Sequence, residues 1–317
     1  MKIVIHMVVS NDSYSYAQNL VRNYVELSQK PELISFKVYC LDKKVYRKIL
    51  KNNLAQVFLV HSTTTKGSFG HALGLAMCLK NLDQGALNVI SDTDVCVVKN
   101  NWDELLRELF DLSDSNLKST KGDNALGILG TTYEDYLGFS TGSSIVQTYK
   151  GSPTLTWCAL SPNYDFTSLN VFPEKQDEFE ISSQELSNVY GLPLGFRLLK
   201  DVGWQLPLFL YNNNIPFRIF QHIKPNSSHA VVLKNGYSYH DEFHLNNQPF
   251  LVHQRGSMKH SYRLDKISKD FYLKVISFLN NPDWMLNPSK NDYLKFGFNI
   301  FRRFLSKIRS IMTKIIK

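Results

Sequence analysis

Apolar and polar positions alternate in blocks over the first hundred residues. Short apolar runs are separated by polar turns and by longer stretches whose apolar residues recur at helical spacing. The short runs predict strands at residues 3–9, 36–41, 57–60 and 86–91. The longer stretches predict helices at residues 16–27, 43–51 and 71–82. This strand–helix rhythm is typical of an α/β protein with a mostly parallel sheet and right-handed crossovers.

After residue 100 the pattern becomes less regular. A further helix is predicted at residues 102–112, and a strand at residues 125–130. Polar or irregular segments then separate the remaining apolar runs, and no internal repeat is present. We therefore place a working boundary near residue 100, between two halves of one α/β unit.

The net charge of +8 is concentrated at the end of the chain. Residues 292–317 carry seven cations and one anion, so the first 291 residues together carry only +2. A nearly neutral body argues against a nucleic-acid-binding surface across the fold. The content of 43% hydrophobic and 20% charged residues is that of a soluble globular protein. All four cysteines lie in apolar segments without a C-x-x-C pair, which predicts reduced thiols in a cytoplasmic protein and no zinc site.

The basic C-terminal segment has apolar residues at helical spacing between its cations. Its cations are Lys295, Arg302, Arg303, Lys307, Arg309, Lys314 and Lys317. Such a helix lies in the plane of an anionic membrane, where each cation contributes roughly 1 kcal/mol. The alternative is a terminal helix that packs on the body of the protein or on a second subunit.

Two aspartates directly follow the predicted strand at residues 86–91. The sequence Asp92-Thr93-Asp94 separates this strand from a second apolar run at residues 95–98. Carboxylates two residues apart on an extended chain point the same way, and ligands of open α/β sheets collect at the carboxyl ends of strands. We expect Asp92 and Asp94 to offer oxygen ligands to Mn²⁺ or Mg²⁺, which in turn would hold a diphosphate. The alternative is an acidic surface turn.

Two later motifs carry further candidate chemistry. The sequence His253-Gln254-Arg255-Gly256-Ser257-Met258-Lys259 follows a strand-like run, and it combines a metal ligand, a flexible glycine and two cations that suit a diphosphate. The alternative is a surface loop whose histidine is simply hydrogen-bonded and binds no metal. Asp201, in the sequence Lys200-Asp201-Val202-Gly203-Trp204, precedes a predicted helix, and this position by itself favours a helix cap that the macrodipole stabilises.

With these motifs, residues 1 to about 262 resemble the nucleotide-sugar-dependent glycosyltransferases of the A-type (GT-A) fold. The D-x-D at Asp92-Thr93-Asp94 resembles the metal-binding motif of that superfamily, and residues 67–75 resemble its nucleotide-holding loop and helix. Lys200-Asp201 is similar to the E-D motif whose acid is the base of inverting members. His253, Gly256 and Lys259 match the H-x-x-G-x-x-K signature of retaining, galactosyltransferase-like members. The last two motifs imply opposite stereochemical outcomes, and the sequence leaves both open.

The resemblance implies a role for each candidate residue. The implied metal ligands are Asp92, Asp94 and His253, with Mn²⁺ or Mg²⁺ as the metal. The implied groups around the nucleotide and its diphosphate are Asp92, Gly70, His71, Arg255, Gly256 and Lys259. Asp201 would be the catalytic base if the reaction inverts the sugar's configuration.

We therefore expect a Rossmann-like GT-A fold, with a mostly parallel mixed central sheet flanked by helices and a C-terminal amphipathic helix. We expect a nucleotide-sugar-binding half at residues 1–100, an acceptor-binding half closing with the His253 loop at 101–264, a packing helix and connector at 265–290, and the basic amphipathic tail at 291–317. The predicted activity is metal-dependent transfer from a nucleoside diphosphate sugar to a glycan or lipid-linked acceptor, by a cytoplasmic protein peripherally bound to an anionic membrane. The alternatives are a nucleotidyltransferase and an inactive, membrane-associated nucleotide- or glycan-binding module.

Overall fold

The structure is a computed structural model, and part of the chain up to residue 254 is described in it. The described residues are 1–11, 13–50, 55–60, 67–111, 125–132, 137–140, 143–146, 151–174, 178–190, 194–195, 197–223, 229 and 240–254. The predicted connector at 265–290 and the predicted tail helix at 291–317 lie outside these residues. So do three candidate site residues, Arg255, Gly256 and Lys259.

The first half of the chain alternates strands and helices as predicted. Its elements are β1 (Lys2–Val9), α1 (Tyr14–Glu26), the short 3₁₀ helix η1 (Pro31–Leu33), β2 (Ile34–Cys40), α2 (Lys43–Leu50), β3 (Gln56–Leu59), α3 (Gly67–Lys80), β4 (Ala86–Ser91), β5 (Val95–Val97) and α4 (Trp102–Asp111). Local polar contacts mark the turns between them. Asp42, for example, accepts a hydrogen bond from the Val45 backbone N–H at 2.9 Å and so caps the start of α2.

The second half consists mostly of short strands. Its elements are β6 (Ile128–Gly130), β7 (Leu137–Ser140), β8 (Ser143–Val146), β9 (Trp157–Leu160), β10 (Glu178–Glu180), α5 (Gln184–Tyr190), β11 (Arg197–Leu199), α6 (Leu206–Asn212), β12 (Phe217–Ile219), β13 (Gln221–Ile223), β14 (His240–Leu245) and β15 (Gln248–Gln254). Several of these strands have only three or four residues, too few for a hydrophobic pattern to distinguish them from loops.

The central sheet has seven strands in the order β12-β6-β9-β4-β1-β2-β3. All neighbouring pairs are parallel except the two that involve β9, which runs antiparallel to β4 and β6. The predicted α/β class, with a Rossmann-like, mostly parallel mixed central sheet flanked by helices, is confirmed. Strands from both sides of residue 100 share this sheet, and the functional division at that residue stays a prediction.

Each face of the central sheet is covered by its own hydrophobic core. On one face, Leu20 and Tyr24 of α1 pack with Ile5 of β1 and with the fully buried Trp102 and Trp157. On the other face, a second cluster joins residues of α3 and α6 to Val8, Tyr39 and Leu160 of the sheet. Because both faces are buried, the central strands are almost continuously apolar, as the sequence indicated.

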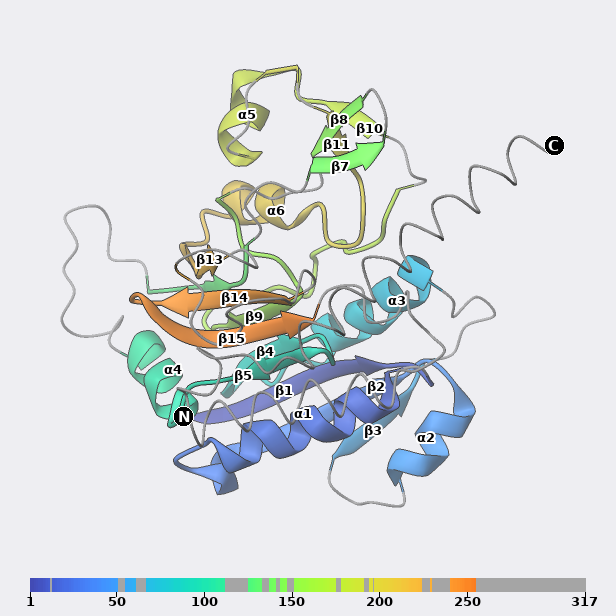
Figure 1. Cartoon of the computed structure of the whole chain (residues 1–317), viewed down its shortest axis with the longest axis vertical. Helices are drawn as coiled ribbons and strands as arrows, with labels where there is room; N and C mark the ends of the chain where they lie inside the picture. The colour runs from blue at the N-terminus through green and yellow to red at the C-terminus, as the bar shows by residue number, and fades with distance from the viewer. Residues whose placement is uncertain are drawn as a thin grey trace, which may run out of the picture.

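Two four-stranded sheets accompany the central one. The sheet β10-β11-β8-β7 lies with α5 at the opposite end of the molecule from α1 and α2, and α6 lies between it and the central sheet (Figure 1). The sheet β13-β14-β15-β5 brings the last described strands of the chain against β5, which directly follows the D-x-D motif. This second pairing places His253 beside the aspartates.

The four cysteines are free and buried, and all lie within the described residues. Burial raises the pKa of the Cys40 thiol to about 12, so this group is not a nucleophile near neutral pH. Among the described residues, no helix is both long enough and apolar enough to cross a membrane.

The close packing of α3 on β1 allows a test of the fold. A Cβ atom at Gly74 would overlap both γ-carbons of Val8, the farther of them at 2.7 Å. We expect Gly74→Ala to lower the free energy of unfolding by about 1–3 kcal/mol, the usual effect of overpacking a core. Gly85→Ala is the matched control, because the nearest atom to its Cβ would be Asp83 Oδ1 at 3.9 Å. Urea unfolding followed by circular dichroism measures both variants, and equal stabilities would contradict the packing of α3.

Candidate metal and nucleotide site

The D-x-D motif forms a tight turn between two strands of different sheets. Strand β4 ends at Ser91, and the Asp92 backbone N–H donates to the Thr156 carbonyl at 2.8 Å. The Val95 backbone N–H then donates back to the Asp92 carbonyl at 3.3 Å, after which β5 begins. The turn thus lies at the carboxyl end of a central parallel strand, which is where open α/β sheets bind their ligands.

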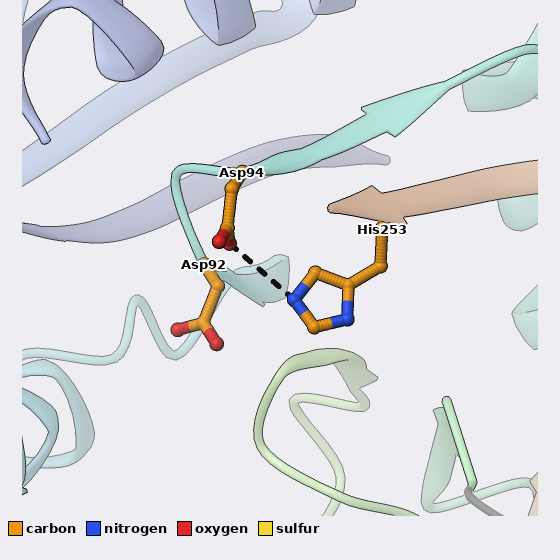
Figure 2. Close-up of side chains that lie close together, drawn as sticks. All are labelled: Asp92, Asp94 and His253. Atoms are coloured by element: carbon orange, nitrogen blue, oxygen red, sulfur yellow. Dashed lines mark ion pairs between the residues drawn. The ribbon is translucent and has the colours of Figure 1, made fainter. Parts of the chain in front are cut away.

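His253 reaches this turn from a distant part of the sequence. Strand β15 runs antiparallel to β5, and His253 is paired with Val95, the residue that follows Asp94. His253 Nε2 lies 3.5 Å from Asp94 Oδ1, and Figure 2 shows the two side chains pointing toward one another beside Asp92. One ligand atom from each of Asp92, Asp94 and His253 lies within 4.8 Å of the other two.

Burial and mutual repulsion shift the proton affinities of these groups. Burial raises the pKa of Asp92 to about 6, and the carboxylate of Asp94 adds to this shift against the opposing effects of His71 and His253. Burial alone would lower the pKa of His253, but the nearby carboxylates of Asp94, Asp241 and Asp92 outweigh it and raise that pKa. The turn therefore holds excess negative charge that a cation would neutralise.

The donor set fits a divalent cation. Two carboxylates and one imidazole suit Mn²⁺, and they also suit Mg²⁺ with less preference for the nitrogen. Ligand atoms bound to one such ion at about 2.0–2.1 Å lie at most about 4.2 Å apart. The separation of up to 4.8 Å exceeds this limit by about 0.6 Å, so the side chains would have to move closer together around one ion. The side chains of His253 and Asp94 are only 11% and 13% exposed, whereas that of Asp92 is 26% exposed.

His71 is also part of this cluster. It lies in the second turn of α3, directly after the buried Gly70, and its Nε2 atom is 3.4 Å from Asp92 Oδ1. The sequence predicted Gly70 and His71 as nucleotide-binding residues, but it contained no signal that His71 contacts Asp92. His71 therefore lies against the Asp92 carboxylate, and its role in nucleotide binding stays a prediction.

Asp201 is described but has no printed contact with the metal cluster. It lies exposed in the turn before α6, and its carboxylate accepts a hydrogen bond from the Val202 backbone N–H at 2.8 Å. The cap residue of α6 is Gln205, so Asp201 is not the cap of this helix. Beside it, the Lys200 ammonium is held by Glu174 at 2.6 Å and lies 5.0 Å from the centre of the Trp204 ring.

A buried contact between a histidine and an aspartate joins β13 to β14 next to His253, and sequence reasoning missed it. Asp241 is paired with His253 across the β14–β15 ladder and contacts His222 Nε2 at 2.9 Å. Both Asp241 and His222 are buried.

A cavity of about 400 Å³ lies elsewhere, between the start of α4 and the β14–β15 turn, and none of the candidate site residues lines it.

The sequence matches no protein-family model and no curated protein. Solved structures do show some likeness to the chain, at low levels. They include residues 1–349 of S. aureus TarS (15% identity, 63% of this chain and 58% of that chain, TM-score 0.36) and mouse xyloside xylosyltransferase 1 (10%, 70% and 86%, 0.37). A 4-diphosphocytidyl-2C-methyl-D-erythritol synthase from Anaerococcus prevotii also matches (13%, 67% and 97%, 0.31). The match thus spans little more than half of the TarS fragment, and likeness at this level does not distinguish between activities.

Protons and metal should compete for this site. Metal binding needs an ionised Asp92 and a neutral His253, and the pKa values of both groups are raised. We therefore expect the dissociation constant for Mn²⁺ to increase as the pH falls from 8 to 5, approaching about 10-fold per pH unit for each proton displaced. Titration calorimetry at several pH values measures this, with circular dichroism as the control for folding. A constant affinity over this range would show that these groups are not the ligands.

Proposed function

We propose that this chain is a metal-dependent glycosyltransferase that transfers a sugar from a nucleoside diphosphate sugar to a glycan or lipid-linked acceptor. The observation that supports it is the convergence of Asp92, Asp94 and His253 at the carboxyl end of β4 in a Rossmann-like sheet. His253 lies more than 150 positions after the two aspartates in the sequence. A simple acidic surface turn would not need a histidine from a distant strand beside it.

In this proposal, Asp94 and His253 hold Mn²⁺ or Mg²⁺, and Asp92 contacts the metal or the donor ribose. The bound ion supplies Lewis-acid stabilisation of the charge that develops on the leaving diphosphate. Arg255 and Lys259, which come after β15 in the sequence, would hold the same phosphates, and Gly256 would let the backbone approach them closely. The Asp94 and His253 side chains are mostly buried and would shield a bound ion from water where they contact it.

The stereochemical course depends on which second motif acts. If the enzyme inverts, Asp201 takes the proton of the acceptor hydroxyl, and its exposure in the turn before α6 leaves it accessible to an acceptor. If the enzyme retains the sugar's configuration, the sequence segment from His253 to Lys259 matches the motif of the corresponding members, and Asp201 has no role as a base.

The loop after β1 favours this proposal over a nucleotidyltransferase. A nucleotidyltransferase needs a glycine- and cation-rich phosphate-binding loop there, whereas this chain has a serine turn. Within that turn, the Ser10 backbone N–H donates to Ser13 Oγ at 2.9 Å, and the Ser13 N–H donates to the Ser10 carbonyl at 3.3 Å. These two N–H groups are therefore already hydrogen-bonded within the turn.

The metal role is tested by Asp94→Asn, with Asp201→Asn as the matched control. We expect Asp94→Asn to weaken Mn²⁺-dependent binding of UDP or GDP by more than about 10-fold, the least effect expected when a metal site loses a supporting group. Its melting temperature in EDTA should stay near that of the wild type, because the substitution removes a repelling charge. Asp201→Asn should keep nucleotide affinity and, in an inverting enzyme, lower turnover by about 10²-fold or more.

The wild-type measurements distinguish the alternatives. Hydrolysis of one member of a nucleotide-sugar panel in the presence of Mn²⁺ supports the transferase, whereas metal-dependent nucleotide binding without any turnover supports the inactive binding module. Nucleotide affinity that is the same in Mn²⁺ and in EDTA would refute the metal claim. A product whose anomeric configuration equals that of the donor, seen in NMR coupling constants, would remove the base role of Asp201.

We further infer that residues 291–317 bind an anionic membrane and bring the site to a lipid-linked acceptor. The support is in the sequence, where a net charge of +6 accompanies apolar residues at helical spacing. The free, buried thiols of the body agree with a cytoplasmic location for such a peripheral protein.

The tail is tested with liposomes of phosphatidylcholine with and without phosphatidylserine. We expect the full chain to bind the anionic liposomes at low salt and to dissociate as salt screens the attraction. Changing Arg302, Arg303, Lys307 and Arg309 to Gln should abolish binding while nucleotide affinity stays at the wild-type value. If the full chain does not bind anionic liposomes at low salt, or if the variant is insoluble, the tail has a structural role instead.

A further inference from the structure

Two consecutive residues of α1, Asn23 and Tyr24, are completely buried beside the D-x-D turn. They lie near the end of the helix, and the Tyr24 carbonyl accepts a hydrogen bond from Trp102 Nε1 at 3.0 Å, which fixes this end of α1 against α4. Neither residue belongs to any motif that the sequence suggested. Their side chains make polar contacts with the two strands on either side of Asp92 and Asp94.

The Tyr24 hydroxyl connects the strand before the turn to the turn itself. It accepts a hydrogen bond from Trp157 Nε1 at 2.6 Å and donates one to Ser91 Oγ at 3.1 Å. Ser91 Oγ in turn donates to the Asp92 carbonyl at 3.0 Å. Burial raises the pKa of Tyr24, so its hydroxyl stays protonated and remains a donor. The three hydrogen bonds thus form a continuous chain from Trp157 through Tyr24 and Ser91 to the Asp92 carbonyl. They thereby restrain the backbone of the residue that bears the first carboxylate.

The Asn23 side chain holds the strand after the turn. Its Nδ2 atom donates to the Val97 carbonyl at 2.9 Å, and its Oδ1 atom accepts from the Val97 backbone N–H at 2.8 Å. A single side chain therefore takes the place of a neighbouring strand on this edge of β5. The other edge of β5 pairs with β15, where Leu251 lies opposite Val97 and His253 opposite Val95. Asn23 thereby fixes β5 in the position from which it aligns both Asp94 and His253.

We propose that Asn23 and Tyr24 are positioning residues that hold the metal-binding turn in its ligand geometry before the metal arrives. This inference rests on the proposed metal-dependent function. Ligand distances in metal sites are held within about 0.2 Å, and groups that orient the ligands commonly change metal affinity by about 10–100-fold. A turn anchored at both ends by buried hydrogen bonds has few other conformations, so little ordering entropy is lost on binding.

A structural role alone would give a different result, and Tyr39 provides the comparison. Tyr39 is also a completely buried tyrosine of the same domain, and its hydroxyl lies 3.1 Å from His6 Nδ1. Within the described part of the chain, the Tyr39 hydroxyl makes no hydrogen bond to the D-x-D turn. Removing either hydroxyl should lower the melting temperature, but only the loss of the Tyr24 hydroxyl should weaken metal binding.

The experiment measures Mn²⁺ binding to the full chain in the presence of saturating UDP, by calorimetry or by loss of the free-Mn²⁺ EPR signal. We expect Tyr24→Phe to raise the Mn²⁺ dissociation constant by about 10-fold or more. Tyr39→Phe should leave it within about twofold of the wild type. Ser91→Ala should weaken Mn²⁺ binding as Tyr24→Phe does. The double variant should have a dissociation constant no higher than that of the single variant that binds Mn²⁺ more weakly, since both changes break the same chain of hydrogen bonds.

The outcomes separate this inference from the proposed function. If the wild type binds no Mn²⁺, both are wrong. If the wild type binds Mn²⁺ and Tyr24→Phe binds it equally well, the metal site stands and the positioning role is overturned. An equal loss in Tyr39→Phe would likewise overturn it, because a general loosening of the fold would then explain the effect. If Tyr24→Phe does not fold, Ser91→Ala decides in the same way.

Discussion

Two carboxylates and an imidazole are kept together at one buried turn, and their electrostatic environment constrains the rest of the site. Two like charges about 4 Å apart repel by about 4 kcal/mol at the effective dielectric constant of a protein surface. Burial raises the pKa of Asp92 to about 6, and the neighbouring Asp94 carboxylate adds to this shift. Without a cation, such a turn would relax by moving its side chains apart. The scaffold must therefore hold the groups in place, and a divalent cation reverses the sign of the interaction.

The scaffold supplies this restraint from three directions. Strand β4 is paired with β1 on one side and with β9 on the other, so the start of the turn cannot shift along the sheet. Strand β5 is held by the Asn23 amide on one edge and by β15 on the other. Helix α3 brings His71 to Asp92 and is packed closely on β1 at Gly74. Each restraint comes from a different part of the chain, and all three meet at the same turn.

Much of the fold could be predicted from the sequence because it is encoded locally. The strand predicted at residues 86–91 coincides with β4, and the first three helices agree with their predicted ranges to within a few residues. The insertion of β9 in reverse direction between β4 and β6 could not be predicted. Neither could the two additional sheets, because strands of three or four residues leave no periodic pattern and their partners are far away in the sequence.

The sequence by itself determined that a D-x-D lies at the end of a buried strand. It also showed His253 at the end of another apolar run, ahead of a glycine and a lysine, although the structure places His253 within β15 and not in a loop after it. It therefore determined the candidate ligands and the fold class. Only the tertiary structure decided that His253 lies beside Asp94, that His71 contacts Asp92 and that Tyr24 joins Trp157 to Ser91. The physical reason is that these contacts depend on which strands pair and which helix covers which face. Strand pairing and helix packing of this kind are set by the burial of apolar surface over the whole chain, so they cannot be predicted from any short segment of the sequence.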